Sequence, residues 1–170
     1  DPESLILAKA FSRTDKSLQD SGVHINWKTF CFSLATTPEE INVLSTRGLF
    51  MKARVFLKIG GFHPILIPHY QSDYEFTHRA YKKGFKLCAY DELFLLEDPT
   101  QTSPREVVVN SFRDFRRKYF TKKSTFYLPS WIAFIVFSCP WRWIPVNLYR
   151  IFRNACSDLT IAAGLRRSAR

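Results

Sequence analysis

The strongest chemical signal in the sequence is a single carboxylate, Asp73, in the first turn of a predicted helix. The loop before this helix holds His69 and Tyr70, whose polar and aromatic groups suit contact with a hydroxyl-rich ligand. The positive end of a helix dipole favours the ionised form of an aspartate at this position. Asp73 is therefore the candidate catalytic residue, although the dipole also favours an acidic side chain there without any chemistry.

Signals at both ends define the helix that carries Asp73. Ser72 precedes Glu75 by three residues, the spacing of a capping box, in which each side chain bonds a free backbone N–H at the other position. Gly84 supplies the left-handed conformation that commonly ends a helix. A capping role for Glu75 is therefore favoured over a contact with substrate.

Periodicity and turn residues predict the other elements of the first half of the chain. These are a short helical stretch at 5–11, a strand-like run at 23–34, a buried strand at 41–51, a short helix at 53–59 and a strand at 86–96. Gly60 and Gly61 end the short helix, and the polar, proline-containing segment 97–106 is predicted to be a linker. Strands and helices mixed in this way predict an α/β domain.

The basic excess lies entirely in the last part of the chain. Residues 1–100 contain 12 Lys and Arg against 12 Asp and Glu, whereas residues 101–170 contain 13 against 3, which accounts for the net charge of +10. A nucleic-acid binder that is basic throughout would not divide in this way. The division predicts an α/β domain at 1–100 and a basic, aromatic helical tail at 101–170.

The tail combines basic and apolar segments. A helix is predicted at 107–120, with six basic residues on it or just beyond it: Arg113, Arg116, Arg117, Lys118, Lys122 and Lys123. The Trp-rich run at 126–146 contains three prolines and an arginine. These leave too few consecutive apolar residues for a membrane-spanning helix, which needs about 20.

An amphipathic helix is predicted from Pro145 onward. Its apolar face carries Leu148, Ile151, Phe152, Ala155 and Leu159. Its polar face carries Asn147, Arg150, Asn154 and Asp158. Basic and aromatic side chains together fit a helix that lies in a membrane interface. The alternative is that the apolar face packs on the rest of the protein or on a further domain.

The histidines and cysteines predict no metal site. Three histidines have no ligand-spaced partner and are interpreted as structural: His24, His63 and His78. The cysteines form no C-x-x-C pair and are expected to be reduced thiols of a cytoplasmic protein: Cys31, Cys88, Cys139 and Cys156. The opening DPESLILAKAF has neither a start Met nor a signal-peptide pattern. The chain is therefore expected to be a fragment without its N-terminal part.

An ordered series of motifs between Arg47 and Lys86 resembles a known family. Its elements are more specific together than singly: Gly48, the IGGF turn at 59–62, Asp73, Glu75, Arg79 and Gly84. The series resembles the C-terminal half of the catalytic domain of family 2 glycosyltransferases, which are inverting enzymes with a GT-A fold. The match covers about half of the chain. It implies the acceptor-side half of a GT-A (Rossmann-like) domain, with a mixed sheet and flanking helices.

The resemblance also implies roles for single residues. Asp73 matches the family's catalytic aspartate, which takes a proton from the acceptor hydroxyl as that oxygen attacks the anomeric carbon. The preceding position, often acidic in the family, is Ser72 here. For Arg79, an internal carboxylate or carbonyl partner is favoured over the donor diphosphate. The candidate substrate-binding residues are Arg47, Gly48, His69, Tyr70 and Arg79.

The expected function is sugar transfer from a nucleotide-sugar donor to a glycan or lipid-linked acceptor of the cell envelope. A divalent cation, Mg²⁺ or Mn²⁺, is expected to neutralise the leaving diphosphate in the complete enzyme, while the family's DxD ligands are absent from this sequence. The expected location is the cytoplasmic face of the membrane, with peripheral attachment through the tail. The alternatives are a non-catalytic peripheral membrane-binding module, which leaves the motif series unexplained, and a nucleic-acid binder, which leaves the Trp and Pro residues of the tail unexplained.

Overall fold

The computed structural model of the chain describes residues 3–98 and 107–165. Most of the predicted linker at 97–106 lies outside the described residues, as do Asp1 and Pro2 of the opening motif. The chain divides into two units, which we call the sheet unit and the helical unit: Asp1–Phe62 with Asp73–Ser103, and His63–Ser72 with Pro104–Arg170.

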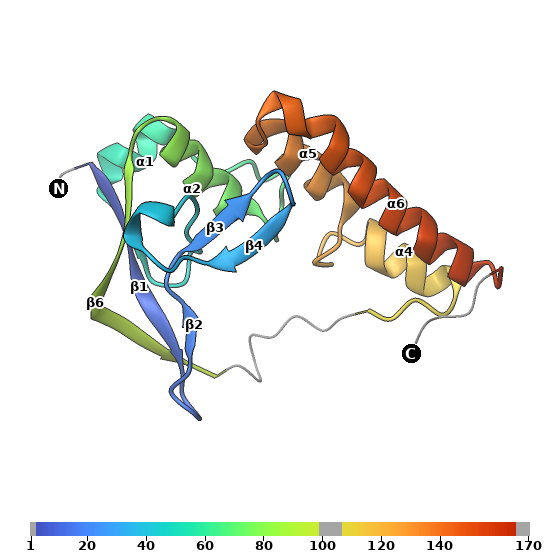
Figure 1. Cartoon of the computed structure of the whole chain (residues 1–170), viewed down its shortest axis with the longest axis horizontal. Helices are drawn as coiled ribbons and strands as arrows, with labels where there is room; N and C mark the ends of the chain where they lie inside the picture. The colour runs from blue at the N-terminus through green and yellow to red at the C-terminus, as the bar shows by residue number, and fades with distance from the viewer. Residues whose placement is uncertain (1–2, 99–106, 166–170) are drawn as a thin grey trace. The chain divides into compact units, whose positions relative to one another are not determined.

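The sheet unit is built around β1 (Ser4–Ser12). This strand pairs antiparallel with β2 (Leu18–Asp20) and β5 (Leu49–Phe50), and parallel with β6 (Lys86–Glu97). The four strands form a mixed sheet (Figure 1). The mixed sheet and its flanking helices agree with the predicted α/β class, and β6 forms where a strand was predicted.

The prediction of a helical stretch at 5–11 is wrong, because these residues lie in β1. Leu5, Leu7 and Ala10 are completely buried. A strand that is buried on both faces has a nearly continuous apolar sequence, which periodicity alone does not distinguish from a buried helix. Pairing with other strands satisfies the backbone groups of β1, and this long-range pairing decides its conformation.

The predicted strand-like run at 23–34 is a hairpin of two strands, β3 (Val23–Asn26) and β4 (Cys31–Leu34). The Asn26 carboxamide oxygen accepts the backbone N–H of Lys28 at 3.0 Å. Asn side chains commonly form such local bonds in turns. The single predicted strand is therefore interrupted by a turn that Asn26 stabilises.

Two helices, α1 (Ala53–Ile59) and α2 (Ser72–Lys82), pack on the sheet. Both begin where the sequence predicts, and Gly60 ends α1 with a left-handed φ of 103°. Their buried side chains join those of the strands in one core, in which each large apolar side chain contributes about 1.5–3 kcal/mol. The core consists of Leu5, Leu7, Ile41, Leu44, Val55, Ile59, Phe76, Ala80 and Leu87.

The prediction of a buried strand at 41–51 is wrong in its conformation, because only Leu49 and Phe50 form a strand, β5. The 3₁₀ helix η1 (Pro38–Glu40) precedes the segment. Side chains of α2 bind its buried backbone: the Thr77 hydroxyl accepts the Leu44 N–H at 2.9 Å. Burial was predicted correctly for residues 41–45 but not for Thr46, Arg47 and Phe50, which are exposed. The hydrogen-bond partners of the buried part come from a helix rather than from a strand.

Gly48 occupies a position that favours glycine. Its φ is 68°, and an added Cβ would lie 2.7 Å from Leu95 Cδ2 and 3.0 Å from Ala8 Cβ. We expect Gly48→Ala to lower the free energy of unfolding by about 1–3 kcal/mol, as measured by denaturant titration. Gly84→Ala is the control, because φ there is 86° but an added Cβ meets nothing within 4 Å. Equal losses in the two variants would contradict a packing role for Gly48.

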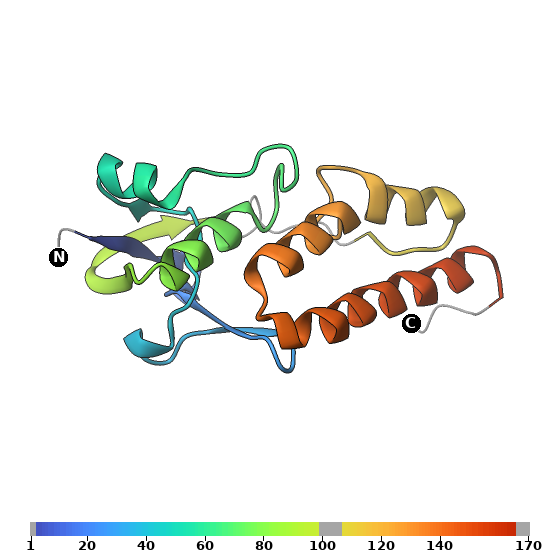
Figure 2. The same ribbon diagram turned by 90° about the horizontal axis from the view of Figure 1, so that it is seen from above.

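The helical unit contains α4 (Phe112–Phe120), α5 (Leu128–Ser138), the 3₁₀ helix η2 (Trp141–Trp143) and α6 (Ile144–Ala162). Helices α4, α5 and α6 lie side by side (Figures 1 and 2). An apolar cluster joins α4 to α6. Beside it, Lys118 and Tyr119 of α4 each donate a hydrogen bond to the Asp158 carboxylate of α6 at 2.8 Å. No helix in the described parts of the chain is long and apolar enough to cross a bilayer.

Two predictions for the helical unit need correction. Helix α4 begins at Phe112 rather than at 107, because the Ser111 hydroxyl caps it by accepting the Asp114 N–H at 3.2 Å. Helix α6 forms as predicted, but Asn147 of its predicted polar face is completely buried. The Asn147 side chain bonds Cys139 and Arg150. The polar side chain of Asn147 is thus buried because its hydrogen bonds are satisfied, while Phe152 and Leu159 of the predicted apolar face stay exposed.

Candidate functional site

Asp73 is the second residue of α2. Its carboxylate accepts the backbone N–H of Tyr74 at 2.9 Å, and the backbone N–H of Thr46 lies close enough to stabilise its charge. Burial raises the pKa of the Asp73 carboxyl above its ordinary value of 3.8, whereas the backbone N–H groups of Tyr74, Thr46 and Asp73 itself and the charge of Arg47 lower it. The raised pKa means that the protein environment makes the ionised form costly, as expected for a base that must take up a proton.

Contacts along α2 place Thr46 beside Asp73. The Thr77 hydroxyl bonds the backbone of Leu44, and the His78 ring Nδ1 lies 3.1 Å from the Asn42 carbonyl oxygen. These bonds fix the segment before Thr46 along the helix. The position of the catalytic candidate therefore depends on buried polar contacts between α2 and a segment that is distant in sequence.

Tyr74 adds a second titratable group to the site. Burial raises the pKa of the Tyr74 hydroxyl, and the negative charges of Asp20 and Asp73 raise it further. The Tyr74 ring is stacked on Phe32, with centroids 6.1 Å apart and an angle of 18° between the ring planes. The phenol stays protonated at neutral pH and is held in one orientation.

Sequence reasoning missed Tyr74, Asp20 and Thr46. Tyr74 directly follows Asp73, and its position at the start of the helix could have marked it as a neighbour of the carboxylate. Asp20 carried no such signal, because β2 reaches the site only through its pairing with β1. Asp20 is 4% exposed, and its carboxylate accepts the Gly22 N–H at 3.0 Å.

The structure brings Arg47 close enough to influence Asp73 electrostatically. The Arg47 guanidinium also forms an ion pair with Glu97 at the end of β6. Gly48, by contrast, packs closely against Ala8 and Leu95. The absence of a side chain at Gly48 therefore lets the chain pack closely against β1 and β6. A substrate contact at Gly48 stays a prediction.

Ser72 and Glu75 have different bonds from those of the predicted capping box. Ser72 is the first helical residue rather than the cap, and its hydroxyl donates to the His69 carbonyl at 2.7 Å. The buried Glu75 carboxylate accepts two bonds from the Arg79 guanidinium, at 2.8 and 2.9 Å. The predicted capping box places Ser72 just before the helix. In the structure, Gln71, with a φ of 66°, occupies that position, and Ser72 is already helical.

Arg79 holds the glycine turn after α1. Besides binding Glu75, its guanidinium donates to the carbonyl oxygens of Ile59 and Gly61, each at 2.6 Å. These bonds fit the favoured interpretation of Arg79 as a residue with internal carboxylate and carbonyl partners. A direct contact between Arg79 and substrate stays a prediction.

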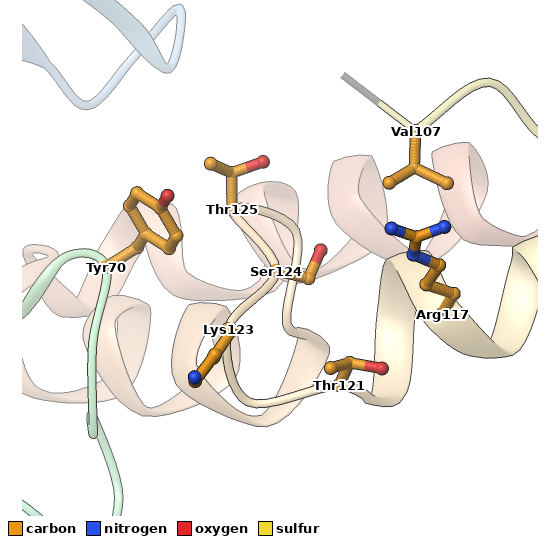
Figure 3. Close-up of a pocket in the computed structure, with 7 residues that line it drawn as sticks. All are labelled: Tyr70, Val107, Arg117, Thr121, Lys123, Ser124 and Thr125. Atoms are coloured by element: carbon orange, nitrogen blue, oxygen red, sulfur yellow. The ribbon is translucent and has the colours of Figure 1, made fainter. Parts of the chain in front are cut away.

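His69 and Tyr70 belong to the helical unit, whereas Asp73 and Arg47 belong to the sheet unit. The rings of His69 and Tyr70 are stacked, with centroids 4.5 Å apart. Tyr70 lines a hollow in the helical unit together with Arg117 of α4 (Figure 3). Within their own unit, these two side chains are held together and lie next to a basic surface.

The remaining histidines and cysteines have structural surroundings. Nδ1 of His24 lies 2.8 Å from the Glu40 carbonyl oxygen, and the rings of His63 and Phe137 are 5.2 Å apart. The cysteines are free thiols, as expected: Cys31, Cys88, Cys139 and Cys156. Comparison with models of protein families, with curated proteins and with solved structures gives no match to this chain.

Proposed function

We propose that this chain is the acceptor-side part of an inverting glycosyltransferase in which Asp73 is the general base. Asp73 takes the proton of an acceptor hydroxyl, whose oxygen bonds to the anomeric carbon while the bond to the nucleotide diphosphate breaks on the opposite face. The acceptor is a glycan or a lipid-linked sugar of the cell envelope. The observation that carries the proposal is the Asp73 carboxylate at the start of α2, with its pKa raised by burial.

A raised pKa favours this role over a purely structural one. A general base is most effective when its pKa approaches the working pH, and burial moves the pKa of Asp73 in that direction. An aspartate that served only the helix dipole would gain from a lowered pKa. The motif series from Gly48 to Gly84 supports the same role through its resemblance to family 2 glycosyltransferases.

The other candidate residues divide by task in this proposal. Arg47 stabilises anionic substrate groups through its charge, and Gly48 keeps the end of β5 closely packed. His69 and Tyr70 contact the acceptor. Arg79 positions the glycine turn and α2 through its internal bonds.

A divalent cation, Mg²⁺ or Mn²⁺, supplies charge neutralisation for the leaving diphosphate when it is bound. The described residues, 3–98 and 107–165, hold no cluster of three His, Cys, Asp or Glu side chains to which we assign this ion. The test of the proposal is the transfer activity of the complete enzyme with Asn in place of Asp73.

The helical unit supports a second candidate function, binding to an anionic membrane surface at the cytoplasmic face. Large apolar side chains stand exposed on its helices: Phe112, Phe120, Trp141, Tyr149 and Phe152. The Trp141 side chain is 84% exposed. Trp is one of the side chains enriched at membrane–water interfaces. Exposed rings near basic residues fit peripheral attachment, either of the enzyme or of a non-catalytic module.

One of the six basic residues on α4 or just beyond it is already bound within the helical unit. Lys118 is bound to Asp158, which leaves five: Arg113, Arg116, Arg117, Lys122 and Lys123. Each contributes about 1 kcal/mol near an anionic bilayer. We expect replacement of all five by Gln to weaken binding to phosphatidylserine vesicles at least about 100-fold, as measured by co-sedimentation, with little change for neutral vesicles.

The matched control removes five exposed positive charges from the sheet unit, by Gln replacement of Arg13, Lys16, Lys28, Lys52 and Lys86. It changes the net charge equally but leaves the helical unit intact. Equal weakening by both sets would show that net charge, rather than the helical unit, binds the vesicles. Binding of the unaltered chain that ignores lipid charge would also contradict the proposal.

A further inference from the structure

A hollow with a volume of about 330 Å³ lies in the helical unit, between the loop before α2 and the turn after α4. Its lining includes Tyr70, Arg117, Thr121, Lys123, Ser124 and Thr125. Figure 3 shows Tyr70 on one side of the turn that carries Ser124 and Thr125, and Arg117 on the other. Small-molecule sites occupy roughly 300–1,000 Å³, so the hollow is large enough for a small polar group.

The lining of the hollow is cationic. Arg117 and Lys123 supply two positive charges, and no described carboxylate lines the hollow. Neither cation forms an ion pair within the described residues. The pKa of nearby Asp114 is lowered first by its bond from Ser111 and only last by the charge of Arg117. Among the described residues, no carboxylate competes with an anion for these two cations.

The chemistry of the lining suits phosphate. A guanidinium binds two phosphate oxygens at once, and an ammonium binds phosphate as a point charge. The hydroxyl groups of Tyr70, Thr121 and Thr125 are neutral donors on the same hollow. A site of this composition favours an anion with several oxygens.

The turn at the hollow is held in one conformation. The Thr125 carbonyl accepts Gln71 Nε2 at 3.3 Å and Trp131 Nε1 at 2.9 Å, and the Ser124 hydroxyl donates to the Lys118 carbonyl at 2.5 Å. Gln71 has a φ of 66°, a conformation that is strained for a residue other than glycine. Strain that surrounding contacts maintain is common at ligand sites.

A second surface feature indicates where the phosphate comes from. Arg117 and Thr121 also line a groove along α4, whose other lining residues are Phe112, Arg113, Asp114, Arg116 and Phe120. Phe112 is 59% exposed and Phe120 is 57% exposed. Exposed rings next to cations favour a phosphate that is attached to hydrocarbon over a phosphate ion free in water.

We propose that this hollow binds the phosphate group of a lipid, with Arg117 on the phosphate oxygens, Lys123 adding positive charge to the lining, and the lipid hydrocarbon beside Phe112 and Phe120. The site adds a specific headgroup contact to the diffuse attraction of the basic residues. It rests on the proposed membrane role for the presentation of the lipid. Binding itself requires no sugar transfer.

The experiment measures binding of the whole chain to dihexanoyl phosphatidic acid below its micelle concentration, by isothermal titration calorimetry. We expect Arg117→Gln with Lys123→Gln to weaken binding at least about 10-fold, the scale of one charge-assisted hydrogen bond. The matched control is Lys28→Gln with Arg153→Gln, which removes equal charge outside the hollow and should change affinity less than about 3-fold. All four side chains are exposed, so melting temperatures should stay unchanged.

Two soluble ligands identify the source of the phosphate. Inorganic phosphate should bind the unaltered chain at least about 10-fold more weakly than dihexanoyl phosphatidic acid, because it has no hydrocarbon for the groove. Dihexanoyl phosphatidylcholine, whose phosphate is a shielded diester, should also bind more weakly.

Equal losses in the hollow and control variants would overturn the site in favour of diffuse charge. Inorganic phosphate that binds as tightly as the lipid would overturn the lipid source. These binding results do not depend on catalysis. A failed transfer assay for Asp73 would therefore overturn the proposed activity without changing the outcome for the lipid site.

Discussion

Replacement of Asp73 by Asn should lower the turnover of the complete enzyme by roughly 100-fold or more, the scale of a general-base contribution. Asn keeps the size of the side chain and an oxygen that can accept the Tyr74 N–H, but it cannot take a proton. The measurement is the initial rate of sugar transfer at saturating donor. A loss in turnover with a small change in KM would place the defect in the chemical step.

The raised pKa of Asp73 predicts two pH effects. Turnover should fall as the pH decreases through this pKa, so the acid limb of the rate profile should lie above the ordinary value of 3.8. Between 3.8 and the raised value, the folded state binds more protons than the unfolded state, so the contribution of Asp73 to stability decreases as the pH rises. Asp73→Asn should therefore unfold no more easily than the unaltered protein at pH 7, and any gain should vanish below 3.8.

The control for Asp73 is Asp91→Asn, because the Asp91 side chain is 87% exposed and paired with Lys9. This variant should keep near-normal turnover and the same acid limb. Near-normal turnover in Asp73→Asn, with unchanged folding, would remove Asp73 from the mechanism. A loss of turnover that is matched by a loss of stability would instead assign Asp73 a structural role.

Replacement of Arg79 by Met should lower the free energy of unfolding by about 3 kcal/mol or more, the scale for breaking a buried ion pair. The Glu75 side chain is 2% exposed, so its carboxylate would be left buried without the charge of the guanidinium. The carbonyl oxygens of Ile59 and Gly61 would also lose their bonds from the guanidinium. The measurement is chemical denaturation followed by circular dichroism.

A double variant separates the two contributions of Arg79. Glu75→Gln with Arg79→Met removes both charges and should recover part of the lost stability, because no buried charge is left alone. The part that is not recovered measures the bonds to the carbonyl oxygens of the glycine turn. A loss below about 1 kcal/mol in Arg79→Met, the scale of an exposed ion pair, would show that these bonds do not support the fold.

Local signals in the sequence predicted the elements that depend on neighbouring residues. Helix α1 begins at Ala53 and ends at Gly60 as predicted, because glycine adopts the left-handed conformation of a helix end at little cost. Helix α2 and strand β6 also form where predicted. The sequence therefore placed Asp73 in the first turn of a helix.

The errors occur where distant partners decide the conformation. The apolar run at 5–11 is compatible with a buried helix or a buried strand, and pairing with β2, β5 and β6 makes it a strand. Residues 41–45 are buried as predicted, but Thr77 and His78 replace a strand as hydrogen-bond partners of this segment. Periodicity reports burial, and it does not report which groups satisfy the backbone.

The sequence by itself determined the type and position of the catalytic candidate, because a carboxylate in the first turn of a helix follows from local spacing. Only the tertiary structure decided its environment. Thr46 reaches Asp73 through contacts along α2, and Asp20 reaches the neighbouring Tyr74 through the pairing of β2 with β1. The pKa of a carboxyl depends on burial and on charges within a few ångströms, and these distances exist only in the folded chain.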